Sequence, residues 1–125
     1  MNRIFLLVGA GGFLGSVARF YFTQFINSCF PSAFPFGTIT VNVIGCLLMG
    51  FLYALAEKTG LLSSEWLIFL TIGVCGGFTT FSGFSYENMV LIQAGQYGTA
   101  LLYTLASVLF CFGALFIGKS ILNFF

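Results

Sequence analysis

The chain has 125 residues, of which 59% are hydrophobic and only 6% are charged, and its formal net charge is +1. Soluble domains carry about 25% charged residues, so this composition excludes a globular domain with a water-covered surface. A net charge so close to zero also argues against a nucleic-acid partner.

Four apolar segments take up most of the chain, and we expect them at residues 3–27, 36–58, 65–95 and 97–122. Each is long enough to cross a hydrocarbon core, which needs about 20 helical residues. Apolar and polar residues do not alternate in these segments, as they would in the strands of a membrane β-barrel. The sequence therefore predicts an all-α, multi-pass membrane protein whose residues 1–125 form one integral membrane domain.

The first segment carries Arg19 well inside its apolar run, where an arginine costs about 2.5–3.5 kcal/mol on insertion scales. Architectural and functional roles both stay open for it. Small residues recur at helical spacing in the same segment, which favours close packing against another helix. They are Gly9, Gly12, Ser16 and Thr23 on the face of Arg19, and the pair Gly11 and Gly15.

Asn42 is the polar outlier of the second segment, in "GTITVNVIGCLLMG". An amide at that depth must bond to another helix or to a passing solute, and its two N–H donors suit an anion. Both interpretations stay open.

The positive charges at the ends of the segments bear on orientation. With four spans, Arg3, Lys58 and Lys119 fall on one side of the membrane, and the loops on the other side are uncharged. The positive-inside rule then favours a cytoplasmic N-terminus. Arg19 lies on the opposite half of the first span and weakens this bias, so insertion in both orientations is compatible with the sequence.

The third segment contains "GVCGGFTTFSGFSYE", residues 73–87, which is rich in glycine and hydroxyl side chains. Gly76 and Gly77 each cost about 1 kcal/mol relative to alanine in a helix, and the hydroxyls of Thr79 and Thr80 compete for backbone hydrogen bonds. We therefore predict a helix that is broken near the membrane midplane. Freed carbonyls there would attract a cation, and freed N–H groups an anion.

Phe81 and Phe84 follow this break at a spacing that places them on one helical face, alternating with Ser82. The edge of a phenyl ring carries a partial positive charge, so rings presented edge-on could solvate an anion. A pair of phenylalanines at helical spacing is also typical of an ordinary core. The spacing alone leaves both interpretations open.

The fourth segment has a stripe of small and hydroxyl residues, which predicts either close helix packing or a polar path. The stripe comprises Thr104, Ser107, Cys111, Ala114 and Gly118. Glu87 is the single carboxylate expected near membrane depth, and the chain has no histidine and no catalytic constellation, so we do not expect an enzyme. The four cysteines have no metal-binding spacing and are interpreted as small hydrophobic residues.

The chain resembles the Fluc (CrcB) family of fluoride channels. Three blocks carry the resemblance, each in the expected span: "GGFLGSVARF" (11–20), "GTITVNVIGCLLMG" (37–50) and "GGFTTFSGFSYE" (76–87). The resemblance implies an antiparallel homodimer of four-helix subunits in the bacterial inner membrane, inserted in both orientations, with two passive fluoride pores.

The resemblance also assigns roles to individual residues. It implies a pore lined by Phe81, Phe84, Asn42 and Ser107, with Thr80, Ser82 and Tyr103 as further candidates. It implies a structural sodium ion at the dimer centre, held by the backbone carbonyls of Gly76 and Thr79, and it matches Arg19 to the arginine of the first-span motif.

Two departures from the family pattern affect the expected polar track. Gly83 stands where the family has threonine, which removes one hydroxyl, and Cys111 is a weaker hydrogen-bonding group than serine or threonine. Two other functions stay open: a small dual-topology proton-coupled transporter, which would need a carboxylate that the first span lacks, and a structural membrane subunit that transports nothing.

Overall fold

The structure, a computed structural model, describes residues 1–125 and contains helices without strands. Four helical runs are long and apolar enough to cross a membrane: α1 (Asn2–Cys29), α2 (Phe36–Thr59), a composite third run (Ser64–Gln93), and a fourth (Tyr97–Asn123) formed by α6 (Tyr97–Ser120) and the short 3-10 helix η2 (Ile121–Asn123). Their ends differ by one or two residues from the expected spans. The predicted all-α architecture with four membrane-spanning helices is confirmed.

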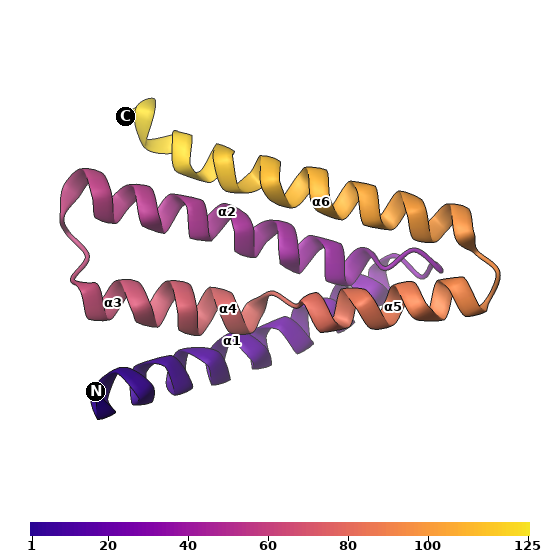
Figure 1. Cartoon of the computed structure of the whole chain (residues 1–125), viewed down its shortest axis with the longest axis horizontal. Coiled ribbons are helices and arrows are strands. Elements are labelled where there is room, and N and C mark those ends of the chain that lie inside the picture. Colours follow the sequence, from indigo (N-terminus) through magenta and orange to yellow (C-terminus); the bar gives the residue numbers. More distant parts are fainter.

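The four runs are arranged lengthwise, so that both termini and the connection from α2 to the third run lie at one end of the molecule (Figure 1). Arg3 binds Glu65 at this end, with Nη2 3.1 Å from Oε2, and joins the start of α1 to the start of the third run. Lys58 bonds Asn123 and joins the end of α2 to the C-terminus. The charged residues thus tie helix ends together outside the apolar layer.

The third run consists of four pieces: α3 (Ser64–Ile68), the π-helical segment η1 (Phe69–Cys75), α4 (Gly76–Phe78) and α5 (Phe81–Gln93). Thr79 and Thr80, between α4 and α5, have extended backbone, with φ/ψ of −92°/158° and −149°/122°. The helical hydrogen bonding is thus interrupted over two residues. The run nevertheless bends by only 14°, and its pieces follow one line in Figure 1.

Glycine contacts bring α2 and α6 close together. A Cβ at Gly50 would overlap the Leu115 carbonyl oxygen, and a Cβ at Gly118 would overlap that of Leu47. Small residues therefore let the two backbones touch, as is typical of helix pairs in membranes. In the fourth-span stripe, Ala114 and Gly118 are buried against this contact, so its last two turns serve packing.

A second set of glycine contacts packs α1 on the third run. Gly11 and Gly15 are the buried residues of α1, and a Cβ on either would collide with backbone of η1. A Cβ on Gly77 would lie 2.5 Å from the Gly12 carbonyl oxygen. A Cβ on Gly9 would meet nothing within this chain, so α1 packs on the third run through its Gly11 and Gly15 side.

The chain alone buries few residues. Only 19 of the 125 are buried, and large apolar side chains such as Phe13, Phe20 and Leu109 point outward. A water-soluble protein could not expose so much apolar surface. The surface must be covered by lipid or by another protein chain, as expected for a multi-pass membrane protein.

Candidate functional site

The interruption at Thr79 and Thr80 is stabilised by an amide from another helix. Asn42 on α2 accepts a hydrogen bond from the Thr80 N–H at 2.7 Å and donates one to the Thr80 carbonyl at 3.1 Å. The Thr80 hydroxyl caps α5 by accepting the Gly83 N–H at 2.9 Å. Asn42 therefore bonds between helices, which was one of the two interpretations of this residue.

These hydrogen bonds use two backbone N–H groups that a continuous helix would pair with its own carbonyl oxygens. In an uninterrupted helix the Thr80 N–H would bond the Gly76 carbonyl, and the Gly83 N–H would bond the Thr79 carbonyl. Both donors point elsewhere here, so these two oxygens lose their helical partners. The Gly77 carbonyl oxygen instead accepts a hydrogen bond from Arg19 Nε at 3.0 Å. Arg19 thus satisfies backbone at the interruption.

A hollow of about 210 Å³ opens beside the interruption, between α2, α5 and α6. It brings together six residues that the sequence singled out and two apolar residues that it did not. The lining comprises Asn42, Thr80, Phe81, Phe84, Ser107 and Cys111, together with Val108 and Phe112. Val108 and Phe112 carry no polar signal, and only their position one and five residues after Ser107 on α6 links them to this face.

Ser107 holds the one buried side-chain oxygen or nitrogen without a hydrogen-bond partner. The residue is 7% exposed and lines the hollow. A buried hydroxyl that lacks a partner costs about 1–3 kcal/mol. An unpaired buried hydroxyl beside a cavity is a candidate for a hydrogen bond to something other than the protein.

Three aromatic rings follow one another from the hollow toward the core. The ring centroids of Phe81 and Phe84 are 5.7 Å apart at an interplanar angle of 41°, and those of Phe84 and Tyr103 are 5.0 Å apart at 45°. Phe81 is 80% exposed, whereas Tyr103 is fully buried. Each ring is thus tilted relative to the next, and two of the three, Phe81 and Phe84, line the hollow.

Tyr103 does not line the hollow, because its hydroxyl belongs to a separate polar cluster. It donates to Glu87 Oε2 at 2.6 Å, and the Thr38 hydroxyl donates to Glu87 Oε1 at 2.5 Å. The sequence predicted a carboxylate at membrane depth but gave no sign of these partners, which come from α2 and α6. The cluster joins α2, α5 and α6 next to the ring of Phe84.

The remaining candidates lie outside the hollow. Ser82 is exposed and its hydroxyl lies 3.2 Å from that of Thr80. Gly76 and Thr79 contribute no lining either. At Gly83, a Cβ would lie 2.9 Å from Thr80 Cγ2, so a larger residue here would press on the capping side chain.

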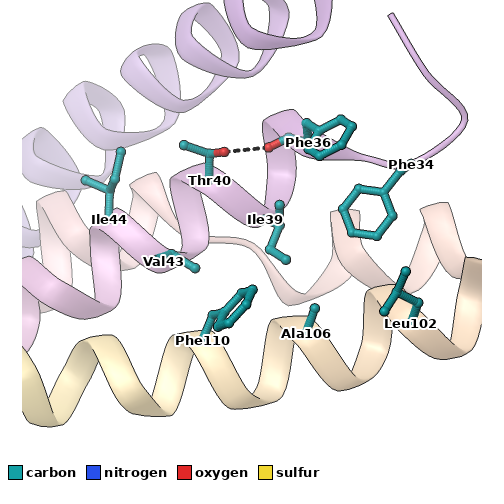
Figure 2. A pocket seen from close by; sticks show the side chains of 9 residues that line it. All are labelled: Phe34, Phe36, Ile39, Thr40, Val43, Ile44, Leu102, Ala106 and Phe110. Atoms are coloured by element: carbon teal, nitrogen blue, oxygen red, sulfur yellow. Dashed lines mark hydrogen bonds between the residues drawn. The ribbon is translucent and has the colours of Figure 1, made fainter. Parts of the chain in front are cut away.

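A larger groove of about 450 Å³ lies between α2 and α6 and is almost entirely hydrocarbon (Figure 2). Its single polar side chain, Thr40, already donates its hydroxyl to the Phe36 carbonyl at 2.7 Å. Apolar side chains such as Phe110, Ile39 and Leu102 line the rest of the groove. A groove of this kind offers a charged solute no compensation for lost water, so it is a poor candidate for an ion site.

Comparison with known proteins places the whole site within one matched region. Residues 6–119 match the model of a family described as "CrcB-like protein, Camphor Resistance (CrcB)". A protein of Chlorobium chlorochromatii named fluoride-specific ion channel FluC is 47% identical over 90% of this chain and 87% of its own length.

Two further proteins with that name match over nearly their full length. One from Caulobacter vibrioides is 48% identical over 94% of this chain and 93% of its own length. One from Azobacteroides pseudotrichonymphae is 43% identical over 100% of this chain and 99% of its own. Since the matched region covers nearly all of the four membrane-spanning runs and every residue that lines the hollow, the chain belongs to the CrcB family.

Proposed function

We propose that this protein is a passive, fluoride-selective channel and that fluoride passes the hollow beside Thr80. The observation that carries the proposal is the buried Ser107 hydroxyl, which has no protein partner and belongs to a residue that lines this hollow. A free O–H donor is what a small anion that has lost water requires. The names of the relatives, fluoride-specific ion channels, support the choice of anion.

The groups around Ser107 compensate the cost of dehydrating the ion. Moving an ion into a low-dielectric medium costs on the order of 20 kcal/mol without compensation. Asn42 Nδ2 carries two N–H groups, of which one is donated to the Thr80 carbonyl. The other, the Ser107 hydroxyl and the edges of Phe81 and Phe84 are the donors that we assign to the ion. Each is weak, which allows the ion to leave again.

The subunit arrangement that we propose is an antiparallel homodimer with two pores. Gly76 is exposed on the surface of the single chain, and its carbonyl lacks its helical donor. Unsatisfied backbone is not tolerated against lipid, so a second copy of the chain is expected to cover this surface. In that dimer the third helix acts as a broken helix, with its two extended residues at the crossing point.

We further propose a structural sodium ion at this crossing, held by the carbonyls of Gly76 and Thr79. These are the two oxygens whose helical donors are redirected to Asn42 and to the Thr80 hydroxyl. Carbonyl oxygens of interrupted membrane helices are suitable ligands for Na⁺. The ion would neutralise their partial negative charge and stabilise the dimer.

The test of the channel is an efflux measurement on the purified protein in liposomes, with fluoride and chloride electrodes. We expect passive fluoride efflux without chloride efflux, and loss of the fluoride signal in Phe81→Ile and Phe84→Ile. Phe110→Ile serves as the matched control, because Phe110 is an exposed phenylalanine on the apolar groove away from the hollow. Equal chloride efflux, or full fluoride efflux in both test variants, would refute the proposal.

The same measurement separates the two alternatives. A proton-coupled transporter would move fluoride slowly and only with a proton gradient, and a structural subunit would give no flux with any variant. No carboxylate lines the hollow, which disfavours proton coupling there.

A further inference from the structure

The hollow beside Thr80 adjoins a larger space between α5 and α6, and Phe84 lines both. This space, the α5–α6 groove, has a volume of about 650 Å³ and extends to Tyr97, the first residue of α6. The connection from α5 to α6 lies at the end of the molecule opposite the termini (Figure 1). The groove therefore offers a route from the hollow, past Phe84, toward the membrane surface.

Successive turns of the same two helices line the two spaces. On α5, Asn88 follows Phe84 by one turn, and on α6, Thr104 precedes Ser107 by one turn. Asn88 and Thr104 line the groove, whereas Ser107 lines the hollow. Thr104 also begins the fourth-span stripe, for which the sequence left packing and a polar path open. A polar lining thus continues one turn beyond the hollow.

The Asn88 amide is fixed by two hydrogen bonds and keeps one donor. Its Nδ2 donates to the Phe84 carbonyl at 3.2 Å, and its Oδ1 accepts the Thr104 hydroxyl at 3.2 Å. Because a carbonyl oxygen can only accept, the Phe84 contact fixes which end of the amide is the nitrogen. An amide nitrogen carries two N–H groups, and only one of them is used here. The second remains for a solute in the groove.

The charges around the groove do not oppose an anion. No acidic side chain lines it. Glu87 precedes Asn88 in the chain, but its carboxylate oxygens accept the hydroxyls of Thr38 and Tyr103, and it lines neither space.

The helix ends at the outer side of the groove add a small positive bias. The backbone N–H groups of residues 94–96 donate to the last carbonyls of α5, which reduces the negative end of that helix dipole. No side chain caps the first turn of α6, so its N–H groups and the positive end of its dipole stay available.

We propose that the α5–α6 groove is the outer part of the fluoride path and holds a second anion site, in which Asn88 Nδ2 donates its unused N–H to the ion. Thr104 is a positioning residue, because its hydroxyl holds the amide oxygen and so leaves the N–H for the ion. Ser85 also lines the groove, but its hydroxyl is donated to the Phe81 carbonyl and has no part in the site. The inference rests on the proposed function, since the groove conducts only what passes the hollow.

The site is tested by fluoride efflux from liposomes over a range of internal fluoride concentrations, which gives a rate and a half-saturating concentration. Asn88→Ala should lower the efflux rate at low fluoride by about tenfold or more, because a hydrogen bond to the charged ion is lost. It should also raise the half-saturating concentration. Asn88→Asp keeps an acceptor for Thr104 but replaces the N–H donors by a negative charge, so its efflux should be lower still.

Thr104 variants separate positioning of the amide from helix packing. Thr104→Val keeps the shape of the side chain and removes the hydroxyl, so it should raise the half-saturating fluoride concentration. Thr104→Ser keeps the hydroxyl and should restore the native value. A residue that only packs would give the reverse order, with valine tolerated and serine impaired, and that result would contradict the positioning role.

Asn123→Ala and Asn123→Asp are the matched controls, because this amide lies at the opposite end of the molecule, where it bonds Lys58. Both should conduct like the native chain. Native efflux from the two Asn88 variants would overturn the groove site and leave the channel standing. Loss of efflux together with single chains on size-exclusion chromatography would assign the groove to a subunit contact and overturn it as well. Absence of fluoride efflux from the native chain would refute the channel itself.

Discussion

Asn42 and Ser107 both line the hollow, but their side chains differ in how many hydrogen bonds the protein gives them. The Asn42 amide is engaged on both atoms with the Thr80 backbone. The Ser107 hydroxyl is buried and engaged with nothing. Removing the first would strand two backbone groups, whereas removing the second would strand none. The stability of the protein and its proposed function can therefore be separated at Ser107.

Ser107→Ala is predicted to reduce fluoride efflux by about tenfold or more, since a hydrogen bond to a charged group is worth about 1.5–3 kcal/mol. The free energy of unfolding should stay the same or rise by up to about 1–3 kcal/mol, because no protein partner is lost and an unpaired buried hydroxyl is removed. Efflux and thermal unfolding in detergent measure the two effects.

The control for this experiment is Ser85→Ala, whose hydroxyl donates to the Phe81 carbonyl at 2.9 Å on the exposed side of α5. It should conduct like the native chain. Undiminished efflux from Ser107→Ala would remove Ser107 from the ion path.

Among the helices, the third run shows how an interruption can be confined. Its glycines and threonines predicted a break, and the backbone does leave the helical form at Thr79 and Thr80. The run still bends by only 14°. The Asn42 amide and the Thr80 hydroxyl take over the redirected donors, so the two halves stay in line instead of separating. The π-helical segment before the break had no sequence signal that we recognised.

The contact of α2 with α6 yields a prediction about helix packing. Gly50→Ala places a methyl group against the Leu115 carbonyl and should destabilise the protein by about 1–3 kcal/mol, the usual cost of overpacking. Gly113→Ala on α6 has open space around it and should be neutral or stabilising by up to about 1 kcal/mol through helix propensity. Thermal unfolding of the two variants in one detergent makes the comparison; equal stability would mean that this contact is not close-packed.

The whole molecule supplies a natural reporter of orientation. Cys29 is exposed at the end of α1 opposite Arg3 and Lys58, while the other three cysteines lie within membrane spans. If the proposed antiparallel dimer inserts in both directions, a membrane-impermeant maleimide should label Cys29 in about half of the molecules in intact cells, and in all of them after permeabilisation. Cys29→Ser should remain unlabelled. Complete labelling, or none, before permeabilisation would indicate a single orientation.

Sodium dependence is the corresponding prediction for the dimer centre. Carbonyl ligands cannot be removed by substitution, so the cation itself is exchanged: replacing Na⁺ by N-methylglucamine should lower the melting temperature and increase the fraction of single chains on size-exclusion chromatography. Choline as a second replacement controls for specific effects of the amine. Identical melting and elution in all three salts would argue against a structural sodium ion.

The sequence by itself determined that the chain is all-α, that it crosses the membrane four times and approximately where. Apolar length and composition are properties of short segments, so no tertiary information is needed to detect them. Polar residues such as Arg19, Asn42 and Ser107 were likewise visible as outliers in an apolar background. The family resemblance supplied roles for them that periodicity alone had left open.

Only the tertiary structure decided which of these residues meet. Asn42 and Thr80 are 38 positions apart, and Tyr103 and Glu87 lie on separate helices, so their contacts depend on how each helix is rotated about its axis. That rotation is fixed by close glycine contacts such as Gly50 against Leu115. A sequence pattern gives the face of a helix but not the partner of that face. For this reason the sequence did not show that Tyr103 is buried and bonds Glu87 beside the hollow.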